Sequence, residues 1–239
     1  FTSYRAQRFR WAYGAMRIGR AHWQALLSPF KRELSLGQRW HFFMGWLPWL
    51  GEGPSLLFLL MGLAWSFASI FAPARVEFPI LLVLPLAGLF AFRLAGLFLL
   101  YRSLAHCGFG ERASAVIARL AVSHASGKAV LLGLVTQHMP FLPTPKMRGA
   151  PPLVQGLATA REELWLFALV WAAMIGTVAV RGLARWNVMF WCLILFAQSL
   201  PYLAAVTVSI LAALPASRLV KAKLPAALPA GGPHLEPGD

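Results

Sequence analysis

Residues 54–71 read PSLLFLLMGLAWSFASIF, an apolar run without a charged side chain. A helix needs about 20 mainly apolar residues to cross the hydrocarbon core of a bilayer, so this run predicts a transmembrane helix. Three more apolar runs follow, at about 79–101, 163–180 and 187–213, and Pro201 is a potential kink site in the last. The sequence therefore predicts an all-α membrane protein with about four transmembrane helices and amphipathic interface helices on the cytoplasmic side.

The overall composition supports a membrane protein. Hydrophobic residues make up 59% of the 239 residues, and the mean hydropathy is +0.63. The formal net charge is +14, which in a soluble protein would suggest nucleic acid. Here the basic residues flank apolar runs, so anionic headgroups or a phosphorylated substrate explain them better, and no nucleic acid is expected. Cys107 and Cys192 lie in different segments and predict free thiols.

The distribution of lysine and arginine predicts the orientation. Most of these residues lie before the first span, between the second and third spans, and after the fourth. The connections on the other side hold only Arg75, Arg181 and Arg185. Because basic loops stay in the cytoplasm, the basic side, which includes the C-terminus, is expected to be cytoplasmic.

Composition divides the chain into five regions. The first is predicted to be a basic interface helix ending near Ser28-Pro29, and the third to hold interface helices before a proline-rich loop at 140–149. The second region is predicted to hold a lead-in helix, a break at 51–54 and two spans. The fourth is predicted to hold two more spans, and the fifth to be a basic segment followed by a disordered tail. The boundaries are 1–38, 39–101, 102–162, 163–214 and 215–239.

A chemically suggestive pattern lies on the first predicted helix. Gln7, Arg10 and Trp11 stand at positions i, i+3 and i+4 and therefore share one face, with Gly14 one turn further on. A guanidinium can bind a diphosphate with two parallel hydrogen bonds, and an indole offers a flat apolar surface to a sugar ring. The residues thus suit a ligand with phosphate and sugar parts. The alternative is an ordinary amphipathic helix whose arginines contact lipid headgroups.

A second pattern is the string PFLPTPK at residues 140–146. Three prolines exclude a helix interior and favour a stiff extended loop. Thr144 and Lys146 are polar groups that such a loop can bring to a nucleotide diphosphate. The alternative is a simple proline-rich connector.

Both strings resemble motifs of the processive family 2 glycosyltransferases, which include cellulose, hyaluronan and chitin synthases. Residues 7–16, QRFRWAYGAM, contain the Q-x-x-R-W signature of that family and look closest to the bacterial β-glucan synthases. The second string resembles the F-x-x-T-x-K gating loop of the cellulose synthase group, with Phe141, Thr144 and Lys146 at the matching positions. Pro143 departs from the arginine or valine found there.

The resemblance implies roles for these residues. Arg10 would hold the diphosphate leaving group, Gln7 and Trp11 would bind the acceptor sugar, and the loop would close over the nucleotide sugar. The family also needs an Asp-x-Asp sequence for Mg²⁺ or Mn²⁺ and an acidic base, whereas the one aspartate here is Asp239. We therefore expect the catalytic domain and its metal upstream in the same polypeptide, with no catalytic or metal-binding residue in this fragment. UDP-glucose, a β-glucan product and the bacterial inner membrane are implied in the same way.

Several residues near the spans are candidates for a glycan path. Trp46 and Trp49 could stack on sugar, although tryptophan also concentrates at membrane interfaces. Arg93 lies in an apolar run and should face protein, water or sugar unless it extends to the interface. Glu52 either caps the helix that follows it or faces the path.

Two other classes of protein remain open. A multi-pass transporter or permease would need polar or broken helices at the membrane midplane, for which Arg93 and the break at 51–54 qualify. A non-catalytic membrane anchor would make both motif matches coincidental.

Overall fold

The computed structural model contains helices as its only regular elements over the residues it describes. Four stretches are long and apolar enough to cross a membrane, namely Glu52–Phe71, Phe109–Val135, Arg161–Arg181 and Trp186–Ala213. The predicted all-α membrane fold is thereby confirmed. The structure describes residues 1–27, 34–78, 88, 91–92, 95–96, 98–99, 102–103, 108–137, 139 and 153–214.

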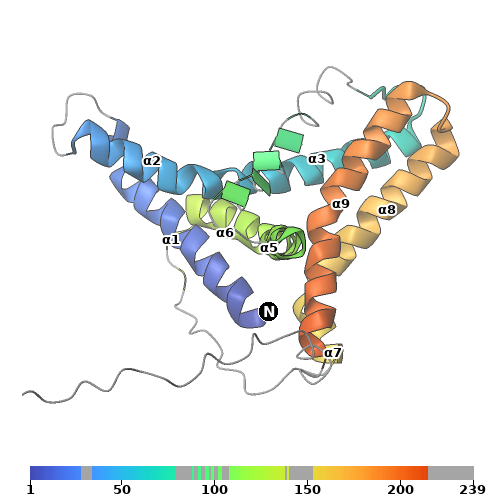
Figure 1. The fold of residues 1–239 in the computed structure, drawn as a ribbon. Helices are drawn as coiled ribbons and strands as arrows, with labels where there is room; N and C mark the ends of the chain where they lie inside the picture. The colour runs from blue at the N-terminus through green and yellow to red at the C-terminus, as the bar shows by residue number, and fades with distance from the viewer. Residues whose placement is uncertain are drawn as a thin grey trace, which may run out of the picture.

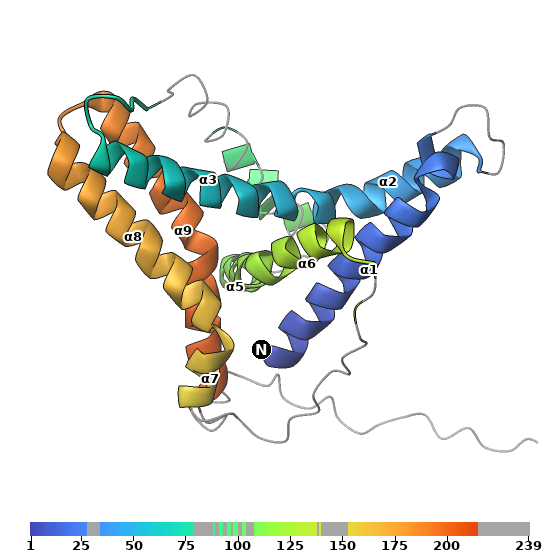
Figure 2. The ribbon, with the colours of Figure 1, turned by 180° about the vertical axis from the view of Figure 1, so that it is seen from behind.

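Two helical arms meet at an angle, as Figures 1 and 2 show from opposite sides. One arm consists of α1 (Thr2–Leu27) and α2 (Leu36–Leu50). The other is a hairpin of α8 (Arg161–Arg181) and α9 (Trp186–Ala213). Helix α3 (Glu52–Phe71) connects the arms.

Three predicted spans are confirmed as α3, α8 and α9. Pro201 lies inside α9, which continues past it. A turn with Gly182 at a positive φ of 75° joins α8 to α9, a conformation that glycine adopts without steric cost. Arg181 donates to the Val76 carbonyl, so this turn and the turn after α3 lie at the same end of the bundle. Most of the predicted span at 79–101 falls outside the described residues, and those described within it (88, 91–92, 95–96 and 98–99) are helical.

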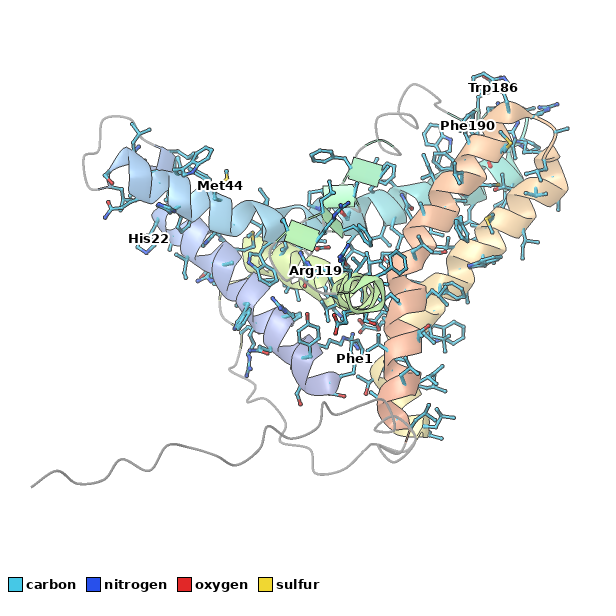
Figure 3. All side chains as sticks on the ribbon, in the orientation of Figure 1. Phe1, His22, Met44, Arg119, Trp186 and Phe190 are labelled. Carbon is cyan, nitrogen blue, oxygen red and sulfur yellow. The ribbon has the colours of Figure 1, made fainter. Side chains whose placement is uncertain are left out.

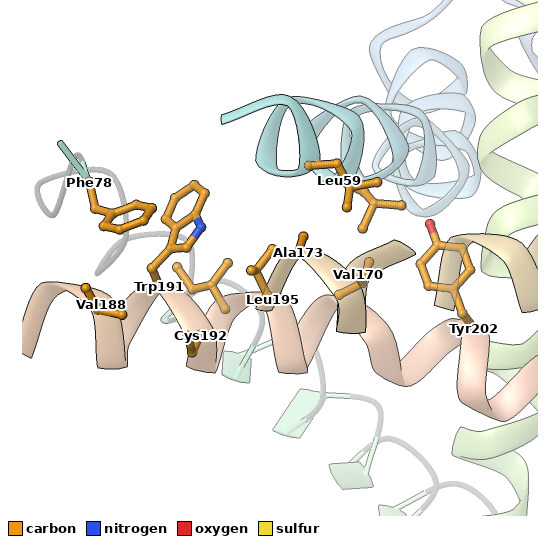
Figure 4. Packing of buried hydrophobic residues seen from close by; sticks show 11 residues of the cluster. Leu59, Phe78, Val170, Ala173, Val188, Trp191, Cys192, Leu195 and Tyr202 are labelled. Carbon is orange, nitrogen blue, oxygen red and sulfur yellow. The ribbon is translucent and has the colours of Figure 1, made fainter. Parts of the chain in front are cut away.

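The apolar core of the bundle lies between α3, α8 and α9 (Figure 4). Leu59, Val170 and Leu195 are fully buried in it. Trp191 stacks on Phe78 with ring centroids 5.1 Å apart. Its indole Nε1 also donates to Ser66 Oγ at 2.9 Å. This hydrogen bond gives the buried indole N–H a partner, which lipid tails cannot supply.

Replacing Trp191 with phenylalanine should lower the free energy of unfolding by about 1–3 kcal/mol. The change removes the hydrogen bond to Ser66 and leaves a void in a packed core. Thermal unfolding in detergent measures the effect. Trp165→Phe on the exposed side of α8 is the matched control, and equal unfolding temperatures for the two variants would contradict the prediction.

The extent of α1 agrees with that of the first predicted helix. Helix α1 ends at Leu27, next to the predicted stop at Ser28-Pro29. Its backbone is non-helical at His22 (φ −115°), so its last turn is displaced from the axis. A Cβ atom added at Gly19 would collide with the Trp46 ring, so Gly19 is where α1 and α2 pack directly.

The break between α2 and α3 is narrower than predicted. It consists of Gly51 alone, because α3 begins at Glu52 and includes Pro54. Proline is tolerated there since the first N–H groups of a helix have no partner within the helix.

Two short helices lie between the arms, α5 (Phe109–Ala121) and α6 (Ser123–Val135). The chain leaves helical geometry at Val122 (φ −104°, ψ 1°), and Figure 1 shows α5 nearly end-on while α6 runs in another direction. Each has 13 residues, or about 20 Å at 1.5 Å per residue, which is less than the hydrocarbon thickness of about 30 Å. Each helix alone is therefore too short to span, whereas Phe109–Val135 as a whole is long and apolar enough to do so. The interface role of this stretch stays a prediction. Helix α7 (Leu153–Thr159) precedes α8.

Candidate functional site

Helix α1 directs Gln7, Arg10, Trp11 and Gly14, which we call the motif face, away from α6. Met16 is only 3% exposed and packs on α6, and it lies nine residues, or about two and a half turns, beyond Gln7 on the opposite side of the helix. Trp11 is 51% exposed. A Cβ atom added at Gly14 would meet nothing within 4 Å. The three motif residues thus share one face beside an open position, as the spacing predicted.

A close approach of backbones holds α1 in this orientation. A Cβ atom at Gly133 of α6 would lie 2.8 Å from Met16 Cβ and 3.0 Å from the Tyr13 carbonyl. Ala12, Ala129 and the Met16 side chain fill the rest of the contact. Small residues let the two helices come together, and this fixes which side of α1 remains outside.

Three α1 side chains bind the C-terminal end of α6. Tyr13 Oη and Thr136 Oγ1 are 3.0 Å apart. Arg17 Nη1 donates to the Thr136 carbonyl at 3.0 Å, and Arg20 Nη1 donates to the Leu134 carbonyl at 2.8 Å. The last carbonyls of a helix lack partners within it, and positive charge is favourable there.

The amino end of α1 is bound to the start of α8. Arg5 Nη2 lies 3.0 Å from Oε1 of Glu163, whose side chain is fully buried, and Arg5 also donates to the Thr159 carbonyl. Glu162 contacts mainly Lys128 Nζ at 2.8 Å and His124 Nε2 at 3.2 Å, and its Oε2 lies farther from Arg5 Nη2, at 3.8 Å. The two glutamates therefore occupy the first turn of α8 and point in different directions, as predicted.

Glu52 stands at the start of α3, as one sequence interpretation expected, and it also forms an ion pair that the sequence did not predict. It is the first residue of α3, where a negative charge is favourable. Its side chain is 1% exposed, and its Oε1 lies 3.0 Å from Arg119 Nη2 of α5. The pair joins α3 to α5.

The other predicted site residues separate into two groups. Trp46 packs on Gly19 of α1, and Trp49 lies beside Arg8 of α1 and Arg119 of α5. Both tryptophans also pack against the apolar cluster between α1 and α6. Four residues lie outside the described part of the chain, namely Arg93, Phe141, Thr144 and Lys146. Sequence reasoning gave no role to Arg8 or Arg119. The helical spacing of Arg8 from Tyr4 and Trp11 was visible in the sequence, whereas the contacts of both arginines with Trp49 depend on how the helices pack.

Comparison with known proteins adds no relative. No family model, no curated protein and no solved structure matches the chain. Over the residues that the structure describes, no group of three or more histidine, cysteine, aspartate or glutamate side chains gathers in a metal-binding arrangement. The helical fold and the four apolar stretches among the described residues define the class as a multi-pass helical membrane protein.

Proposed function

We propose that the chain is the membrane part of a processive glycosyltransferase. It would polymerise a sugar from a nucleotide sugar, UDP-glucose, into a β-glucan and pass the polymer across the bacterial inner membrane. The observation that carries the proposal is the motif face of α1, where Gln7, Arg10 and Trp11 stand together beside the open position at Gly14.

Each residue of the motif face has a chemical task in this proposal. Arg10 binds the diphosphate and stabilises the negative charge that develops on it as its bond to the sugar breaks. Trp11 stacks on the acceptor sugar through its exposed indole, and Gln7 exchanges hydrogen bonds with sugar hydroxyls. Phe141, Thr144 and Lys146 form the loop that closes over the nucleotide and excludes water.

In this proposal, other parts of the polypeptide bind the metal, provide the catalytic groups and form the path for the glycan. A domain upstream in the same polypeptide binds the nucleotide with Mg²⁺ or Mn²⁺ and provides the catalytic aspartates. The anchored α1 forms the floor of the site, and the spans form the path for the growing glycan, with the motif face and the C-terminus in the cytoplasm.

The test uses the full-length polypeptide in membrane vesicles with labelled UDP-glucose. Trp11→Ala and Thr144→Ala should each lower polymer synthesis at least about tenfold, because a loss of about 1.4 kcal/mol in transition-state binding has that effect. Trp23→Ala is the matched control, since Trp23 is 55% exposed on the same helix about three turns further on. Wild-type levels of synthesis in both motif variants would mean that the two motifs are only membrane-surface structure. That result would favour a transporter or a membrane anchor.

A further inference from the structure

Arg8 occupies an interior position of the motif string and is surrounded by aromatic rings. Its Cζ atom lies 5.0 Å from the centroid of Tyr4, 5.0 Å from that of Trp11 and 5.8 Å from that of Trp49. All three distances are within the range of about 6 Å over which a cation is attracted to a ring face. Arg8 therefore connects a residue of the motif face with a tryptophan at the end of α2.

The contacts continue beyond Trp49. The guanidinium of Arg119 lies over the same indole, with its Cζ atom 5.7 Å from the ring centroid. Arg119 is in turn paired with the buried carboxylate of Glu52. A row of alternating planar groups, which we call the stacked row, thus leads from Trp11 through Arg8, Trp49 and Arg119 to the first turn of α3. Figure 3 shows Arg119 in the interior, between the two arms.

The chemistry of Arg8 indicates that stacking is its main interaction. Its Nε atom is buried and makes no hydrogen bond among the described residues. A guanidinium is planar and weakly hydrated and packs flat on aromatic rings, which an ammonium group cannot do. Trp11 stays 51% exposed despite this contact, so part of its indole is available to a ligand.

We propose that Arg8 is a positioning residue for the acceptor sugar. It holds the Trp11 indole in one orientation and ties it to Trp49, so that the acceptor-binding surface and the first turn of α3 are fixed relative to each other. Arg8 itself touches no reacting atom in this scheme. The inference rests on the proposed function, because it takes Trp11 to be the surface on which the acceptor stacks.

Arg8→Met in the full-length enzyme should lower kcat about tenfold and shorten the polymer. The KM for UDP-glucose should stay within about twofold, because other groups bind the nucleotide. Arg8→Lys should retain more activity than Arg8→Met but less than wild type, since an ammonium keeps the attraction to the rings without the planar contact. Arg75→Met, at an exposed arginine in the turn after α3, is the control and should behave as wild type.

A double-mutant comparison separates this inference from the proposed function. If Arg8 acts through Trp11, adding Arg8→Met to Trp11→Ala should cause no further loss. The positioning role would be overturned if the activity losses of the two single variants multiply in the double variant. It would also be overturned if Arg8→Met loses activity only in step with a lower unfolding temperature and leaves the polymer length unchanged. Should Arg8→Met not fold, the kcat, KM and polymer length of Arg8→Lys decide in the same way. Loss of synthesis in Trp11→Ala with full activity in both Arg8 variants would reject this inference alone, whereas full activity in Trp11→Ala would reject the proposed function and this inference with it.

Discussion

Replacing Arg5 with methionine is expected to lower the free energy of unfolding by about 3–5 kcal/mol. The reason is Glu163, which is fully buried and has the Arg5 guanidinium 3.0 Å away as its charged partner. Removing one member of a buried ion pair leaves the other as an uncompensated charge, and this is much more costly than the pair itself. The variant should also release the amino end of α1 from α8, because Arg5 binds the Thr159 carbonyl as well.

A second variant shows whether the buried charge is the cause. Among the described residues neither oxygen of Glu163 accepts a well-directed hydrogen bond, so the double variant loses mainly the hydrogen bond from Arg5 to the Thr159 carbonyl. Arg5→Met combined with Glu163→Leu should therefore recover most of the stability. Reversible unfolding in mixed micelles gives the free energies. If the double variant is as unstable as Arg5→Met alone, the charge argument is wrong and the lost packing of the Arg5 side chain is responsible.

The spans were predictable because their signal is local. The runs at 54–71, 163–180 and 187–213 needed only length and hydropathy, and they reappear as α3, α8 and α9. The placement of Gln7, Arg10 and Trp11 on one face also followed from the helical repeat. These features depend on neighbours within a few residues, which a single sequence displays directly.

The contacts that organise the site were not predictable in this way. Arg5 and Glu163 are far apart in the chain, as are Glu52 and Arg119, and many arginines could have paired with either carboxylate. Glu52 illustrates the limit: its position at the start of α3 was foreseen, while its burial and its partner depend on how α5 packs. The direction change at Val122 was likewise invisible to a pattern of apolar residues.

Gly127→Leu should destabilise the protein by about 3 kcal/mol, because it forces α3 and α6 apart. A Cβ atom at Gly127 of α6 would lie 2.7 Å from the backbone carbonyl of Glu52 and 3.2 Å from Leu56 Cβ. The obstacle is backbone and cannot rotate away, so α3 and α6 must separate, and overpacking of this kind costs about 1–3 kcal/mol or more. Helix α3 also has a glycine at this contact, since a Cβ atom at Gly53 would meet Val130 Cγ1 of α6 at 2.7 Å.

The matched control is Gly45→Ala on α2, where an added Cβ atom meets nothing within 4 Å. That change should be neutral or stabilising by about 0.5–1 kcal/mol, because glycine is a poor helix former. Unfolding temperatures of both variants in detergent provide the comparison, and similar values would mean that α3 and α6 do not depend on this contact. If the proposed function holds, Gly127→Leu should also lower polymer synthesis below the level that its folded fraction explains. Separation of the helices moves Glu52, and with it Arg119 and the far end of the stacked row that begins at Trp11.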